Sequence, residues 1–128
     1  FLSDDDERRL AALRNQLLAR RDGRIRPGFD DKVLADWNGL MIAALARAGV
    51  VFAKPAWIEM AKAAFAFVNR NMARDGDRLW HSTREGKVSA PGTASDYAAM
   101  TWAALRLYQA VGGTAYLEAA KGWTAVLG

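Results

Sequence analysis

Apolar residues recur at helical spacing in five stretches of the chain. The first begins at Ser3, whose hydroxyl is a helix cap, and three aspartates follow at the positive end of the helix dipole. The other four are expected at about residues 30–52, 56–72, 93–111 and 114–128, with turn signals containing proline or glycine between them. This pattern predicts an all-α fold of consecutive αα-hairpins, in which Asp30 or Asp31 caps the second helix.

The longest break in this helical pattern is the connection over residues 75–92. It opens with Asp75-Gly76-Asp77 and closes with Pro91-Gly92. Residues 78–83 and 87–89 are separated by Arg84-Glu85-Gly86, which is typical of two short strands joined by a tight turn. A small β-hairpin is therefore possible in this connection.

Most large apolar residues fall on helical stripes. The expected stripe of the second helix comprises Val33, Trp37, Leu40, Met41, Ala44, Leu45, Ala48, Val51 and Phe52. The buried side of the third helix is expected to carry Trp57, Met60, Ala61, Ala64, Phe65 and Val68. Trp57, Trp102 and Trp123 all lie on such stripes, so we expect them in the core.

The second half of the chain repeats the first. Asp36-Trp37 precedes Asp96-Tyr97 by 60 residues (96 minus 36), and two Ala-Ala-Leu runs have the same separation. A period of this length with two helices indicates an αα-hairpin repeat. We divide the single segment 1–128 into a leading helix (1–23), a first hairpin (30–74), the long connection (75–92) and a second hairpin (93–128).

Each hairpin has more than one apolar side, and two hairpins cannot cover each other completely. The sequence therefore predicts further repeats in a larger helical toroid. It also predicts that this segment alone exposes apolar surface and self-associates. Since the chain starts at Phe1 and stops within a helical pattern, we interpret it as a segment of a longer protein.

Composition narrows the possible settings. The chain has no cysteine, which excludes disulfides within it and permits a reducing, cytoplasmic location. No apolar run is long enough to span a membrane. The net charge is +4, and seven arginines fall between Arg8 and Arg26. Without interleaved aromatic residues, this cluster favours a solvated helix face over nucleic-acid binding.

The repeat places a candidate site. Asp36 and Asp96 both lie near the starts of helices that open the two repeats, so they should face one common rim, and the 75–92 connection should lie on that rim too. Carboxylates among aromatic rings suit sugar recognition and acid–base chemistry on sugars. The candidate catalytic residues are Asp36 and Asp96, and the candidate substrate-binding residues are Trp37, Asn38, Trp80, His81 and Tyr97.

Structural roles compete with these assignments. A capping box with Thr93 accounts for Asp96 without any catalysis. Asp36 is expected about a turn and a half inside its helix, so capping does not explain it, although exposure or pairing with Lys32 or Arg47 does. Trp80 is either a lid over the core or a binding surface. His81 is the only histidine, and no second histidine or any cysteine stands at ligand spacing, so we expect no metal site and no cofactor.

Several motifs together resemble a known family. They are Arg26-Pro27, Asp30-Asp31-Lys32-Val33-Leu34, Asp36-Trp37-Asn38-Gly39-Leu40-Met41-Ile42 and Asp96-Tyr97-Ala98. The chain is similar in these runs to the bacterial YyaL-like proteins and the related spermatogenesis-associated thioredoxin-domain proteins. The resemblance implies an interior slice of a six-hairpin glycosidase-like (α/α)6 toroid, which follows a thioredoxin-like domain in that family.

Two functions follow as expectations. The first is carbohydrate binding or processing by the full-length protein, glycosidase- or epimerase-like, with the fragment alone inactive. Here Asp36 is the acid or base, and Trp37, Tyr97 and Trp80 are ring platforms. The alternative is a non-catalytic helical scaffold whose rim or groove binds a protein partner. Since epimerases of the related fold use paired histidines, His81 alone supports the epimerase version poorly.

Overall fold

The computed structural model describes residues 2–128; Phe1, where the predicted leading segment starts, lies outside the described residues. The chain divides into two compact units, Phe1–Asp30 and Asp31–Gly128. The candidate site lies entirely in the second unit.

The first unit contains the helix α1 (Asp4–Asp22). Its start confirms the predicted cap: Ser3 and Asp6 form a capping box, in which the Ser3 side chain accepts from the Asp6 amide and the Asp6 carboxylate accepts from Ser3. None of its residues is buried. The helix is therefore stabilised by its cap, its charged ends and surface pairs such as Arg8–Asp5.

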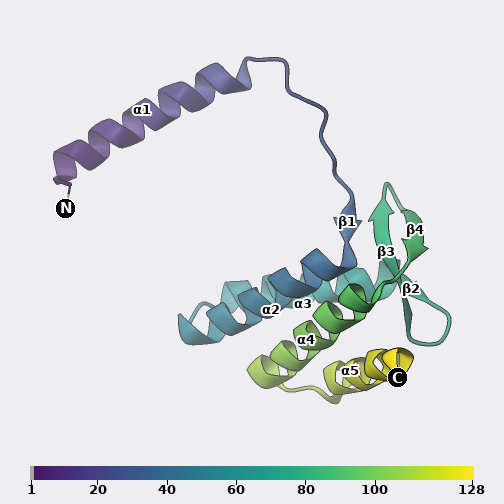
Figure 1. Ribbon diagram of the computed structural model, residues 1–128. Helices are drawn as coiled ribbons and strands as arrows, with labels where there is room; N and C mark the ends of the chain where they lie inside the picture. Colours follow the sequence, from purple (N-terminus) through teal and green to yellow (C-terminus); the bar gives the residue numbers. More distant parts are fainter. Residues whose placement is uncertain (1) are drawn as a thin grey trace. The chain divides into compact units, whose positions relative to one another are not determined.

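The second unit contains the two predicted hairpins. In the first, α2 (Ala35–Val51) packs on α3 (Pro55–Asn71); in the second, α4 (Ala94–Val111) packs on α5 (Thr114–Leu127). The two opening helices, α2 and α4, lie side by side and join the hairpins (Figure 1). The described residues thus form the five helices that the periodicity predicted.

The all-α prediction needs a correction, because a small antiparallel sheet accompanies the helices. It consists of β1 (Val33–Leu34), β2 (Ala73–Arg74), β3 (Arg78–Arg84) and β4 (Lys87–Pro91). All three other strands pair with β3. The hairpin β3–β4 confirms the two strands expected in the long connection. The two-residue strands β1 and β2 were missed, because they are ordered by pairing with a distant strand and not by any periodicity of their own.

The start of α2 also differs from the prediction. Neither Asp30 nor Asp31 caps this helix; its N-cap is Leu34, the last residue of β1. Strand β1 holds the preceding residues in extended conformation by pairing Val33 with Thr83 and Leu34 with Ser82. Asp36 consequently lies in the first turn of α2 and not a turn and a half inside it.

Small residues fill the contact between α2 and α4. The buried residues of α2 are Ala35, Gly39, Ile42, Ala43, Ala46 and Gly49. A Cβ on Gly39 would come within 2.7 Å of the Ala99 carbonyl carbon, so the two backbones approach closely at this point. The core continues through Met100, Leu107, Phe65 and Trp123.

Several large apolar residues of the expected stripe point the other way. Trp37, Leu40, Met41, Val51 and Phe52 of the expected stripe are exposed. The core assignment is confirmed for Trp123 but wrong for Trp57 and Trp102, which are more than a third exposed. Hydrophobicity alone does not distinguish the helix face that packs within this chain from a face that does not, so the sequence pattern predicts the core for both. Across residues 2–128, no helix combines the length and apolar character needed to cross a bilayer.

Candidate functional site

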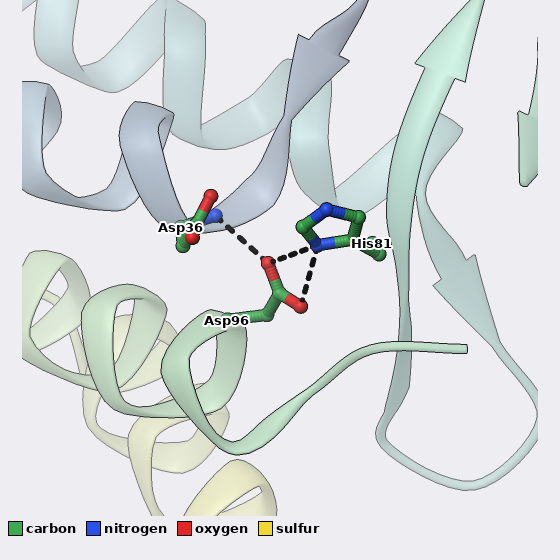
Figure 2. A group of neighbouring side chains, drawn as sticks. All are labelled: Asp36, His81 and Asp96. Atoms are coloured by element: carbon green, nitrogen blue, oxygen red, sulfur yellow. Dashed lines mark hydrogen bonds and ion pairs between the residues drawn. The ribbon is translucent and has the colours of Figure 1, made fainter. Parts of the chain in front are cut away.

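The N-terminal ends of α2 and α4 meet at one end of the second unit. The backbone amide of Asp36 donates a 3.0 Å hydrogen bond to Oδ1 of Asp96, 60 residues along the chain. The expectation that the two repeat-related aspartates share one rim is therefore confirmed (Figure 2). Strand β3, from the long connection, brings His81 to the same place. We call Asp36, His81 and Asp96 the aspartate–histidine cluster.

Asp96 is the central residue of this cluster and has no exposed surface. Its Oδ2 accepts from the amide and the hydroxyl of Thr93, at 2.7 and 2.8 Å, which completes the predicted capping box of α4. Its Oδ1 accepts from Asp36 at the start of α2. One buried carboxylate thus caps α4 and also satisfies a first-turn amide of α2. The positive ends of both helix dipoles stabilise its negative charge.

His81 lies beside this carboxylate. Its Nδ1 is 3.0 Å from Oδ2 and 3.1 Å from Oδ1 of Asp96. The other ring nitrogen, Nε2, points away from Asp96 (Figure 2). The side chain is 31% exposed, so solvent reaches the ring while its partner stays buried. The position of His81 is fixed by β3, since the neighbouring residue Ser82 pairs with Leu34 on one side and Ser89 on the other.

Asp36 is half-buried, and its carboxylate is not engaged by Asp96. Oδ1 accepts from the Trp37 amide at 2.8 Å, which is a first-turn contact within α2. Oδ2 is 3.5 Å from the Ser95 hydroxyl, a long contact across to α4. Asp36 therefore combines a helix-terminal role with an oxygen that is held only weakly.

The remaining predicted site residues differ in whether they are exposed at the rim or already engaged in the fold. Trp37 is 71% exposed next to Asp36. Asn38 donates to the Leu34 carbonyl at 2.8 Å and so braces the β1–α2 corner. Tyr97, by contrast, is buried, and its hydroxyl accepts from the Leu79 amide at 3.1 Å. Its ring belongs to the core in this chain.

Trp80 lies partly buried on β3, and one of its faces is already covered. The guanidinium carbon of Arg74 stands 4.3 Å from its ring centre, within cation–π range. Sequence reasoning did not single out Arg74, because its contact depends on the unpredicted strand β2, where Arg74 pairs with Arg78.

The cluster brings together three groups of the kinds that bind metal ions. One potential ligand atom from each of Asp36, His81 and Asp96 lies within 4.8 Å of the others. The sequence analysis expected these residues at one rim but no metal site, because it looked only for a second histidine or a cysteine as a ligand and left the two carboxylates out. However, both oxygens of Asp96 already accept protein hydrogen bonds. The donor set therefore suits a histidine–carboxylate pair better than an open cation site.

Comparisons with known proteins agree with the family motifs. No family profile matches the chain. Human spermatogenesis-associated protein 20 is 33% identical over 112 residues, which cover 80% of this chain and 14% of that protein. The chain thus spans about a seventh of the length of this relative.

Solved structures share the fold at low identity. The GH76 alpha-mannanase BT2949 of Bacteroides thetaiotaomicron has a TM-score of 0.70 and 16% identity over 80% of this chain and 29% of its own. The Lin0763 protein of Listeria innocua has a TM-score of 0.66 and 13% identity, covering 74% of this chain and 28% of its own. An unsaturated glucuronyl hydrolase specific for heparin has a TM-score of 0.57 and 21% identity, covering 79% and 31%.

The sequence relative and the structural neighbours agree with each other. The two hairpins share the helical fold of these glycoside hydrolases. The chain is thus similar in sequence to spermatogenesis-associated protein 20 and in fold to glycoside hydrolases, in agreement with the family that its motifs resemble.

Proposed function

We propose that the full-length protein containing this chain binds or processes a carbohydrate at the rim where α2 and α4 begin. The observation that carries the proposal is the meeting of Asp36, His81 and Asp96 at one end of hairpins that share the fold of glycoside hydrolases. Fold alone does not define chemistry, so these three side chains support the proposal more strongly than the fold does.

The chemistry of this rim suits a polyhydroxylated ligand. Asp36 offers a carboxylate oxygen with only a long contact to Ser95, which leaves it able to accept from a sugar hydroxyl or to exchange a proton. Trp37 presents an exposed ring beside it, and such rings cover the apolar face of a pyranose. Asp96 is buried and serves as a support for the site.

We further propose that the two hairpins form part of an (α/α)6 toroid. The exposed apolar residues of α2, among them Leu40 and Met41, then pack against a neighbouring hairpin of the full-length protein. The chain covers 29% of the GH76 mannanase with which it shares its fold, which leaves room for such neighbours. On this proposal the segment alone is inactive, because the opposite wall of the site comes from other hairpins.

The experiment compares full-length wild type with Asp36→Asn and a control. Asp77→Asn is the matched control, because it removes a carboxylate from the long connection and asparagine tolerates the positive φ of 52° at this residue. The probes are α-mannooligosaccharides and unsaturated glucuronides, by calorimetry and by product analysis. If Asp36 transfers a proton, Asp36→Asn lowers turnover roughly a hundred-fold or more at unchanged melting temperature, while the control does neither. Equal turnover with a lowered melting temperature would retire the catalytic role.

The exposed apolar face of α2 also favours a second candidate function, a non-catalytic scaffold that binds a protein partner. Trp37, Leu40 and Met41 lie together on this face. If none of the sugar probes binds the folded full-length protein and this face remains exposed there, the scaffold becomes the better proposal.

A further inference from the structure

We infer that His81 and Asp96 form a proton-transfer dyad, in which Nε2 of His81 exchanges a proton with a hydroxyl group and Asp96 is the positioning residue. The inference deepens the proposed function, on which it rests for the identity of the hydroxyl group as one of a sugar or of water. The dyad itself is a property of this chain and is testable without any sugar.

The tautomer of His81 follows from its partner. An ionised carboxylate has only acceptor oxygens, so a ring nitrogen at 3.0 Å from Oδ2 and 3.1 Å from Oδ1 must carry a proton. Nδ1 is therefore the N–H of the neutral ring, and Nε2 has the free lone pair. Histidines that act as bases are commonly oriented in this way by a carboxylate on the other nitrogen.

The orientation of the Asp96 carboxylate is fixed by donors other than His81. Three donors from the helix ends hold its two oxygens: the Asp36 amide at 3.0 Å, and the Thr93 amide and hydroxyl at 2.7 and 2.8 Å. The residue has no exposed surface, so water does not compete for it. A carboxylate held in this way orients the imidazole and stabilises the imidazolium that forms when Nε2 takes up a proton.

The strand that carries His81 is fixed as well. The Trp80 amide donates to the Met72 carbonyl at 2.8 Å, and the Leu79 amide donates to the buried Tyr97 hydroxyl. On the other side of His81, Ser82 pairs with β1 and β4. Only the ring edge with Nε2 is thus left to react, and it belongs to a side chain that is 31% exposed.

The proton balance of the step is simple. A hydroxyl group gives its proton to Nε2 as its oxygen bonds to the anomeric carbon of the sugar, and the bond from that carbon to the leaving oxygen breaks. The leaving oxygen keeps the electron pair of that bond and takes up the proton of a protonated Asp36 carboxyl, while the His81 ring becomes an imidazolium whose Nδ1–H stays on Asp96. In the reverse step Nε2–H returns the proton to a leaving oxygen. Asp36, the other proton-exchanging group of the cluster, then acts on a different oxygen of the same ligand.

Nuclear magnetic resonance of the ¹⁵N-histidine-labelled chain tests the dyad, and His81 gives the only histidine signals. The measurement is made with chelator at about pH 8, where an imidazole is neutral. We expect a protonated-type Nδ1 and a lone-pair-type Nε2, with this tautomer favoured roughly tenfold or more, as for a hydrogen bond to a charged group. A ring protonated on Nε2 instead would overturn the inference, even if no variant folds.

Two variants test whether Asp96 sets the tautomer of His81 independently of any effect on folding. Asp96→Asn, checked for helix content by circular dichroism, should lose the tautomer preference. Asp36→Asn removes the neighbouring carboxylate but leaves the Nδ1 partner, so it should keep the preference. An unchanged tautomer in folded Asp96→Asn, or a metal-bound ring in wild type prepared without chelator, contradicts the dyad.

Diethyl pyrocarbonate gives a second readout, because it acylates the unprotonated ring nitrogen. Wild type should take up one equivalent on histidine, at Nε2 of His81, and His81→Gln should show no histidine acylation.

If no sugar binds but His81 has the expected tautomer, the carbohydrate proposal is refuted and the dyad is retained. The opposite tautomer with sugar turnover would refute the dyad and leave the role of Asp36.

Discussion

The amide of Asp36 and the carboxylate of Asp96 are joined by a 3.0 Å hydrogen bond between equivalent positions of the two repeats. Because the same carboxylate completes the capping box with Thr93, the first turns of two adjacent helices depend on one buried side chain. Removing it leaves donors from both helices without an acceptor, and this gives the first prediction.

Asp96→Ala should lower the free energy of unfolding by about 3 kcal/mol or more, since each buried unsatisfied donor costs about 1–3 kcal/mol. The matched control is Asp6→Ala, which removes the equivalent capping-box acid from exposed α1. That control should leave the main transition unchanged. Urea denaturation followed by tryptophan fluorescence measures both, and similar effects for the two variants would contradict the shared-cap role.

Gly39→Ala should destabilise the second unit by about 1–3 kcal/mol, the usual range for overpacking. The added Cβ would meet the backbone carbonyl of Ala99 at 2.7–2.8 Å, and backbone cannot rotate away. Gly28→Ala is the control, because nothing lies within 4 Å of its added Cβ. If Gly39→Ala has the melting temperature of wild type, α2 and α4 lie further apart in solution than in this structure.

The cap of α1 should depend on pH in a defined direction. The Ser3 side chain and then its backbone amide lower the pKa of Asp6 below 3.8, because both stabilise the ionised carboxylate. Since the folded pKa is depressed, the stabilisation is present above 3.8 and is lost as the pH falls through the folded value. Carboxyl chemical shifts measured against pH report it. Ser3→Ala should raise the pKa of Asp6, and no change would contradict the cap.

The 128-residue chain should self-associate through the exposed face of α2. Replacing Trp37, Leu40 and Met41 together with glutamine should shift sedimentation toward the monomer. Leu17→Gln is the control, because Leu17 is as exposed as Trp37 but lies on α1. A wild type that sediments as a monomer at high concentration, without binding an apolar dye, would contradict the prediction.

Much of the fold was predictable from local signals. The bounds of α1, α3, α4 and α5 follow from caps, proline and glycine, which act on their own neighbours. The start of α2 was not predictable from local signals, because Val33 and Leu34 pair with Thr83 and Ser82 of the distant strand β3. A strand of two residues leaves no periodic trace, so its influence on the adjoining helix was missed too.

The face of α2 was misjudged for a different reason. Helices that approach closely bury their smallest residues, as Gly39 does against Ala99, and the larger side chains are then left for other contacts. The small-residue spacing of Gly39, Ala43, Ala46 and Gly49 was the available signal.

For the site, the repeat alone brought Asp36 and Asp96 together, whereas the bond between Asp96 and His81 depends on a strand register. The position of the 75–92 connection predicted His81 at the rim but did not indicate which ring nitrogen faces Asp96. The tests of sugar binding and of the His81 tautomer decide what these residues do there.

The pairing of β1 with β3 has a consequence for the order of folding. Val33 pairs with Thr83, so this contact closes a loop of 50 residues (83 minus 33) that contains the whole α2–α3 hairpin. Contacts of long sequence separation are formed late, because loop-closure entropy opposes them until local structure has shortened the path. Asp96 meets Asp36 across a still longer loop of 60 residues. We therefore expect the helical hairpins to form first and the aspartate–histidine cluster to be among the last parts of the chain to assemble.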